Sequence, residues 1–312
     1  MVGFLIVLLA AFFFCFQNVI VRILFNPQII LGVLPTGGFV EPTLYNSFLL
    51  MAMRMVVVVP LMASLSQPLY PQVWKDIYQL RHPQNRRSAL HAMISGGLMF
   101  LYLALLYLSI GLIPTGIALT LFFTYPVFTA CFVWAWFGNR PPPLQWVIMA
   151  GILIGSALTV PYGNQVADTQ NLGLGIILGV ASGVAHALYT VNAQKSFESM
   201  HPVPFTWISF AVTLGLSAIC LLFWPAQASA SPYWRPLWIG GLLSAIFTCT
   251  GHLLVNYGIR QIGATTTAMV SASNPALTVV LAWITIQETL GSIQILGVVL
   301  VTFCVILLSR VR

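Results

Sequence analysis

Polar side chains able to bind a solute occur inside long apolar runs of this sequence. Arg54 lies near the centre of one run. Another run contains His186, Tyr189 and Asn192, which are spaced three residues apart. Residues three or four apart share one face of a helix. The three side chains therefore predict a polar stripe on a helix, and Arg54 predicts a site for an anionic group or a carbonyl on a solute.

His252 and Asn256, four residues apart, form a second pair of the same kind. Each of these groups has a second interpretation that the sequence leaves open. His186 and His252 could be hydrogen-bonded in helix packing, and Arg54 could cap backbone carbonyls or extend to the membrane surface.

The sequence does not contain the residue combinations that are typical of known enzyme active sites. Each carboxylate falls in a loop or at a helix end, so no acidic pair stands within the apolar runs for metal or acid–base chemistry. Ser182 precedes His186 by one helical turn but has no orienting partner, and no P-loop, HExxH or CxxC motif occurs. We expect a protein that is not an enzyme and uses no metal or cofactor. The five carboxylates are Glu41, Asp76, Asp168, Glu198 and Glu288.

The composition indicates an integral membrane protein. With 59% hydrophobic and 5% charged residues, the chain cannot cover a globular surface with groups that suit water. Ten runs approach the ~20 residues that a helix needs to cross a bilayer, which predicts an all-α fold. They are Gly3 to Phe25, Leu44 to Ser66, Leu90 to Ser109, Thr115 to Phe137, Leu144 to Pro161, Leu172 to Gln194, Val203 to Trp224, Leu237 to Tyr257, Ala264 to Ile286 and Ser292 to Leu308.

An internal repeat divides these ten helices into two sets of five. The stretch Ser109 to Gln145 recurs, much altered, as Gly258 to Gln294, and one offset aligns Pro126 with Pro275. Each proline follows a polar pair in mid-run, Thr124-Tyr125 in one copy and Ser273-Asn274 in the other. Because five is odd, the second half enters the membrane from the opposite side, so residues 1–161 and 172–312 predict an inverted repeat.

The basic residues predict the orientation. With the N-terminus in the cytoplasm, the outer side carries only Arg22 and Arg235, as the positive-inside rule requires. Both termini are then cytoplasmic, and the net charge of +7 reflects topology rather than nucleic-acid binding. The inner loops and C-terminus carry Lys75, Arg81, Arg86, Arg87, Arg140, Lys195, Arg260, Arg310 and Arg312.

Two connecting segments are longer than the rest. Residues 26–43 are rich in glycine and proline without a clear period, and we assign them no regular structure. Residues 67–88 mix aromatic and basic side chains. The pattern favours a basic loop that fixes topology, and the alternative is an interfacial helix on anionic lipid.

The second half carries a resemblance to a known family. The segments GIRQIGATTTAMVSASNPALTVVLAW and IQETLGSIQILGVVLV resemble the EamA-type exporters of the drug/metabolite transporter superfamily. The first half departs from the family pattern, with Asn139 where a glutamate is usual, then Arg140 and three prolines. The resemblance implies a central cavity between the halves, export of amino acids, metabolites or toxic compounds, and alternating access. It also implies that Glu288 caps a helix, and it matches Arg54 to a family arginine.

We therefore expect a transporter that moves a small polar or amphipathic organic solute outward through a midplane cavity. Pro126 and Pro275 would act as hinges, and the partners would be the solute and the lipid bilayer of a bacterial inner membrane. A proton could be carried only by histidine or tyrosine, so uniport or exchange fits at least as well.

The alternative is a membrane sensor or assembly subunit with a static bundle. The candidate lining residues are Gln17, Asn18, Arg54, Tyr102, Thr124, Tyr125, His186, Tyr189, Asn192, His252, Asn256, Ser273 and Asn274.

Overall fold

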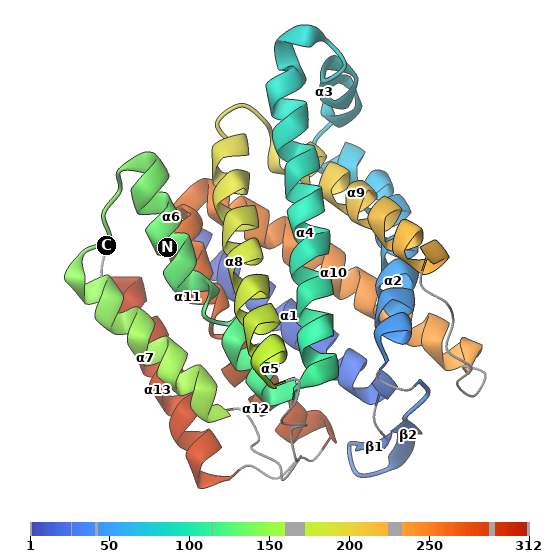
Figure 1. Ribbon diagram of the computed structural model, residues 1–312, viewed down its shortest axis with the longest axis vertical. Coiled ribbons are helices and arrows are strands. Elements are labelled where there is room, and N and C mark those ends of the chain that lie inside the picture. The colour runs from blue at the N-terminus through green and yellow to red at the C-terminus, as the bar shows by residue number, and fades with distance from the viewer. Residues whose placement is uncertain are drawn as a thin grey trace.

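The computed structural model is a bundle of long helices with one small β-hairpin (Figure 1). It describes residues 2–25, 27–40, 43–113, 115–159, 172–223, 233–286 and 291–310. The elements are α1 (Val2–Phe25), β1 (Pro27–Ile30), β2 (Leu34–Gly37), α2 (Leu44–Leu69), α3 (Val73–Gln79), η1 (Pro83–Asn85), α4 (Arg86–Leu112), α5 (Thr115–Phe122), α6 (Tyr125–Phe137), α7 (Pro143–Thr159), α8 (Leu172–Ser196), α9 (Pro202–Phe223), α10 (Trp234–Ile262), α11 (Ala264–Ser271), α12 (Asn274–Ile286) and α13 (Ser292–Arg310).

The apolar runs fold as helices, as the composition predicts. Within the described ranges, nine spans are long and apolar enough to cross a membrane. The run predicted from Leu144 to Pro161 appears as α7, whose 17 residues extend about 25 Å at 1.5 Å per residue. This length is shorter than the ~30 Å hydrocarbon core. The integral-membrane, helical class is thus confirmed, whereas a tenth crossing stays a prediction.

Each mid-run proline interrupts its helix. Two residues separate the end of α5 from the start of α6, and Pro126 occupies the first turn of α6. The same break separates α11 from α12, with Pro275 in the second position of α12. Proline has no N–H and its ring crowds the carbonyl four residues earlier, so the helical ladder stops there. Thr124 and Ser273 donate their hydroxyls to the carbonyls of Leu121 and Val270, at 2.6 and 2.7 Å.

The glycine-rich segment after α1 is ordered, so the expectation of no structure for residues 26–43 was wrong in its centre. β1 and β2 pair antiparallel, with Ile30 opposite Leu34. Leu31 and Gly32 take positive φ values of 50° and 73°, which suit the turn of a hairpin. The Leu31 N–H donates to the carbonyl of Thr285 at 2.7 Å, which anchors the hairpin to the end of α12.

The segment 67–88 is also not an irregular loop, because it contains α3 and η1. Val73 is fully buried, and the ring of Trp74 meets that of Trp207 on α9 edge-on at 5.4 Å. These contacts fix a short helix where the sequence favoured a loop. Whether it lies on anionic lipid stays a prediction.

The two ends of the bundle differ in what they carry. The α3 end, uppermost in Figure 1, also holds the turns between α6 and α7, between α8 and α9, and between α10 and α11. The hairpin end holds β1, β2 and the turn between α4 and α5. The described basic residues that were predicted to share one membrane face gather at the α3 end.

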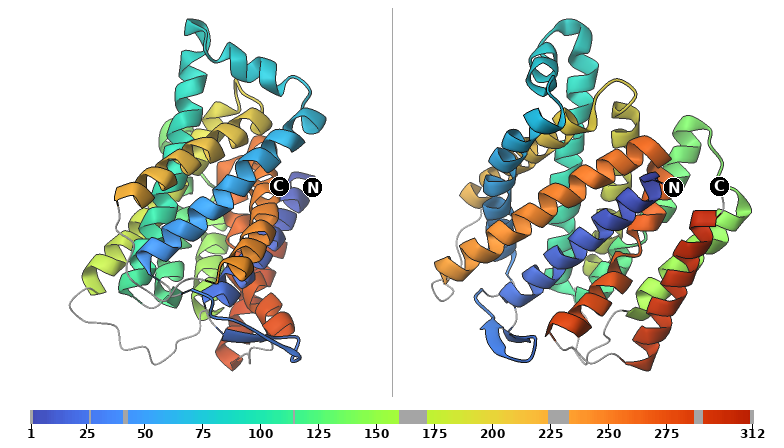
Figure 2. Two further views of the ribbon diagram at one scale, coloured as in Figure 1. Left: turned by 90° about the vertical axis from the view of Figure 1, so that its right-hand side faces the viewer. Right: turned by 180° about the vertical axis from the view of Figure 1, so that it is seen from behind.

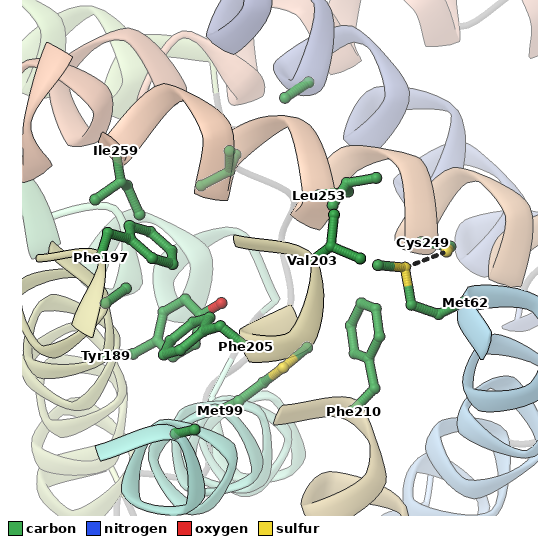
Figure 3. Packing of buried hydrophobic residues seen from close by; sticks show 14 of the residues in the cluster. Met62, Met99, Tyr189, Phe197, Val203, Phe205, Phe210, Cys249, Leu253 and Ile259 are labelled. Atoms are coloured by element: carbon green, nitrogen blue, oxygen red, sulfur yellow. Dashed lines mark hydrogen bonds between the residues drawn. The ribbon is translucent and has the colours of Figure 1, made fainter. Parts of the chain in front are cut away.

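The helices pack in matched pairs (Figure 2). The closest packing is between α4 and α8, α1 and α10, and α7 and α13. α2 packs on α9, and α6 on α8 is matched by α12 on α1. The largest cluster of buried apolar side chains lies where α2, α4, α8, α9 and α10 meet, with Met62 against Cys249 and Phe205 beside Tyr189 (Figure 3).

Close approach of α7 and α13 depends on glycine and gives a prediction about stability. A Cβ on Gly297 would lie 2.6 Å from the carbonyl oxygen of Gly155 and 2.9 Å from Cβ of Leu158. Gly297→Leu should lower the free energy of unfolding by about 1–3 kcal/mol, since overpacking forces the helices apart. Thermal unfolding in detergent measures this. The control is Gly241→Leu, where a Cβ meets nothing described within 4 Å. Equal losses in both variants would contradict the packing argument.

Candidate functional site

Arg54 is buried in the interior of the bundle. It lies ten residues after the start of α2, about 15 Å along the helix axis, and its exposed fraction is 4%. Its Nη2 donates to the hydroxyl of Tyr107 on α4 at 3.2 Å. Such burial argues against a side chain that extends to the membrane surface.

No carboxylate in the described part of the chain lies within ion-pair distance of Arg54. The two described carboxylates are engaged at the α3 end: Asp76 accepts from Tyr70 at 2.8 Å, and Glu198 pairs with Lys195 at 2.7 Å. Arg54 lies close enough to Tyr102 and His252 to interact with them electrostatically. The guanidinium is therefore a buried cation with a neutral phenol as its hydrogen-bond acceptor.

His186 is surrounded by aromatic rings. The ring centroids of Tyr125, Tyr102 and Phe122 lie 4.3, 4.7 and 5.3 Å from that of His186, all edge-on. The centroid of Tyr189 lies 6.0 Å away. Helices α4, α5, α6 and α8 supply these rings, because the break before Pro126 places Phe122 and Tyr125 on either side of one turn. Nδ1 of His186 is buried without a hydrogen-bond partner among the described residues, and such an atom is rare in folded proteins.

Asn256 and Tyr189 form a buried hydrogen-bonded chain. The Tyr189 hydroxyl donates to Oδ1 of Asn256 at 3.2 Å, and Nδ2 of Asn256 donates to Oγ1 of Thr206 at 2.8 Å. His252, one turn before Asn256, meets the rings of Phe14 and Phe210 edge-on at 4.9 and 5.6 Å. Asn256 thus holds Tyr189 in place, and His252 packs between the two phenylalanine rings.

A second polar network ties α1 to α10 and α12. Asn18 donates to Oδ1 of Asn274 at 2.8 Å, and Asn274 donates to the carbonyl of Ala11 at 3.0 Å. Gln17 accepts from the hydroxyl of Thr248 at 2.8 Å. These predicted site residues therefore hold helices together in this conformation.

The Asn18–Asn274 bond gives a prediction. Asn18→Ala and Asn274→Ala should each lower the free energy of unfolding, and a double-mutant cycle should return a coupling of about 0.6–1.7 kcal/mol, the range for hydrogen bonds between membrane helices. Detergent unfolding of the wild type, both single variants and the double variant measures it. Additive losses within error would mean that the bond contributes nothing.

Asn192 lies apart from the other candidates, toward the α3 end. Its Oδ1 is 2.7 Å from Nδ1 of His91, and its Nδ2 donates to the carbonyl of His91 and to Oγ of Ser95 at 2.8 and 2.7 Å. All its polar groups are thus satisfied between α4 and α8. His91 and Ser95 were not among the candidate site residues, although their spacing of four on one helix was a signal.

The central polar layer is closed in this structure. Tyr102, Tyr125, Tyr189 and Asn256 have exposed fractions of 5%, 2%, 1% and 0%. Tyr107, whose hydroxyl accepts the Arg54 hydrogen bond, was not among the candidate lining residues. A midplane cavity lined by these residues stays a prediction. In the part of the chain that is described, no three histidine, cysteine or acidic side chains gather as a metal site.

An aromatic and charged cluster joins α2 to α9 at the α3 end. The rings of Tyr70 and His201 stack with centroids 4.1 Å apart and planes at 8°, and Tyr257 meets His201 edge-on at 5.7 Å. The Val203 N–H donates to Nδ1 of His201 at 3.3 Å, which requires that nitrogen to be unprotonated. Burial lowers the pKa of His201 from its ordinary 6.5, with help from the charge of Arg260 and partial opposition from Asp76.

This pKa shift sets the direction of a pH dependence. Because the folded protein holds His201 at a lowered pKa, the unfolded chain takes up a proton first as the pH falls below 6.5. The contribution to stability is therefore complete above pH 6.5 and declines below it. The melting temperature of the wild type should fall more between pH 7.5 and 5.5 than that of His201→Gln. Parallel profiles would contradict this role for His201.

Known proteins resemble this chain along its whole length. The model of the EamA-like transporter family matches residues 173–310. A Synechocystis protein described as uncharacterized transporter sll1319 is 56% identical over 309 residues, covering 99% of this chain and 93% of its own. The threonine/homoserine exporter RhtA of Escherichia coli K12 is 27% identical over 226 residues, covering 70% of each chain.

A solved structure supports the fold. It is described only as the crystal structure of a protein, and it matches with a TM-score of 0.72 over 99% of this chain and 98% of its own. At 15% sequence identity, the match bears on the fold alone.

Proposed function

The chain belongs to the EamA-like transporter family of the drug/metabolite transporter superfamily, and on that premise we propose that it exports a small anionic or zwitterionic organic solute. The family resemblance seen in the residues is thereby confirmed, and membership of a transporter family favours transport over the static-sensor alternative. The solute class that we propose is an amino acid or related metabolite, and the buried Arg54 carries the proposal.

The energetics of Arg54 favour an anionic solute. A guanidinium at the centre of a membrane helix costs about 2.5–3.5 kcal/mol on insertion scales. One hydrogen bond to the neutral hydroxyl of Tyr107 offsets part of this cost. A carboxylate would offset more, since it accepts two parallel N–H bonds from a guanidinium. The solute would thus supply the counter-charge that the described residues do not.

The rings around His186 suit the remainder of such a solute. Tyr102, Tyr125 and Tyr189 offer apolar faces with one polar tip each, and the unpartnered Nδ1 of His186 can accept a hydrogen bond. The name of the RhtA relative as a threonine/homoserine exporter supports the amino-acid class. The other candidates named from sequence remain proposed contacts in another conformation of the cycle.

We propose that residues 1–161 and 172–312 are inverted five-helix repeats with ten membrane crossings in all. In the proposed cycle of alternating access, the central cavity opens first to one side of the membrane and then to the other. The matched packing supports this: α4 with α8 corresponds to α10 with α1, and α6 with α8 to α12 with α1. The breaks before Pro126 and Pro275 would be the hinges. The α3 end and both termini would be cytoplasmic, in a bacterial inner membrane, with a proton or a second solute exchanged.

Counterflow of radiolabelled L-threonine into liposomes tests the proposal. Arg54→Ala should reduce uptake about tenfold or more because a charge-assisted hydrogen bond is lost, whereas Arg54→Lys should retain part of the activity. Arg87→Gln removes an equal charge from an exposed position at the α3 end and should transport normally. Transport by Arg54→Ala at the wild-type rate, with folded protein in the membrane, would refute the role of Arg54. Counterflow without a pH gradient would show that proton coupling is not obligatory.

A further inference from the structure

A hollow of about 250 Å³ opens at the α3 end between the two halves of the chain. Its wall comes from the end of α6, the turn before α7, the last part of α8 and the turn between α10 and α11. Arg140 is the single charged residue in this wall. We call it the Arg140 hollow, and its polar lining residues are Asn139, Arg140, Gln145, Gln194, Thr265 and Thr266.

The backbone around Arg140 is stiff. Gly138 ends α6 with φ of 72°, a left-handed conformation that suits glycine, and its N–H donates to the carbonyl of Trp134 at 3.0 Å. Pro141 and the two prolines after it then fix φ through the turn. The Arg140 guanidinium lies over the ring of Trp134 at 5.2 Å. This stacking leaves its N–H edge available, and it makes no hydrogen bond or ion pair with any described residue.

The opposite wall of the hollow also favours negative charge. α11 begins there with Gly263 as a cap that has no side chain, and the Ala264 N–H donates to Oε1 of Gln194 at 2.6 Å. The first N–H groups of a helix carry partial positive charge. Oγ1 of Thr265 is buried without a hydrogen-bond partner among the described residues. Arg140 from one half of the chain and the start of α11 from the other half thus line one hollow.

A second hollow at the same end has the opposite character. It measures about 170 Å³, and Asp76 is its only charged lining residue. Its other polar lining residues are Gln79, Asn85, Ser88 and Ser199. Of these two hollows, the Arg140 hollow is therefore the one whose charge favours an anion.

We propose that the Arg140 hollow is a docking site for the carboxylate or phosphate group of the transported solute, occupied before the solute reaches Arg54. This inference rests on the proposed function, because it takes the solute to be anionic or zwitterionic and to arrive from the α3 end. A phosphate of a lipid headgroup shares the same chemistry. The test below separates the two sources.

Equilibrium binding of radiolabelled L-threonine to the full chain in phosphatidylcholine nanodiscs tests the docking site. The wild type should bind two molecules. Arg140→Gln should weaken one of these sites about tenfold or more, the loss expected for a charge-assisted bond, and Arg140→Lys should restore part of it. In the counterflow assay, Arg140→Gln should raise KM about tenfold with the maximal rate within about twofold. Arg87→Gln is the charge-matched control and should bind two molecules.

The outcomes separate this inference from the proposed function. A wild-type isotherm in Arg140→Gln would overturn the docking site and leave the role of Arg54 intact. Normal binding and transport in Arg54→Ala would overturn the proposed function, whatever Arg140→Gln does. If the wild type still binds two molecules of L-threonine in nanodiscs that contain phosphatidylglycerol, this result supports the Arg140 hollow as a site for the solute. Loss of the Arg140-dependent site there would overturn it, because the lipid headgroup would then be the ligand.

Discussion

A guanidinium held inside an apolar bundle is the constraint around which this structure is arranged. Arg54 is buried on α2, donates to Tyr107 and has no described carboxylate within reach. A charge in that position persists only if polar groups or a ligand compensate it. The helices that surround it bring tyrosine and histidine rings, and not acidic groups, to the same layer. Under the proposed function, the transported solute would supply this compensating charge and then leave.

Closure around this layer depends on small residues and on hydrogen bonds between distant helices. Gly155 and Gly297 allow α7 to lie against α13, and Asn18 joins Asn274 across α1 and α12. Hydrogen bonds of this kind contribute little each, about 0.6 kcal/mol on average in membrane proteins. Hydrogen bonds of this strength can be broken and replaced by others at little cost in free energy. For a bundle that would repack in the proposed transport cycle, such contacts are better suited than a few strong ones.

The sequence predicted most of the helical fold and less of the site. Apolar runs and the prolines at 126 and 275 mark local preferences, so the helices and both breaks could be foreseen. The hairpin at Pro27–Gly37 could not, because the contact that anchors it joins Leu31 to Thr285 far along the chain. The sequence placed His186, Tyr189 and Asn192 on one face of a helix, yet Asn192 bonds His91, 101 residues away in the sequence. Spacing places side chains on a face, whereas only packing decides what that face meets.

The central claim, that Arg54 recognises the anionic group of the solute, has a direct test in ligand-induced stabilisation. A ligand that binds the folded state raises the melting temperature by an amount that grows with the logarithm of its concentration divided by Kd. The account predicts that L-threonine raises the melting temperature of purified protein and that L-threoninamide, which lacks the carboxylate, does not. In Arg54→Gln the two compounds should act alike. Equal stabilisation of the wild type by both compounds would contradict the account.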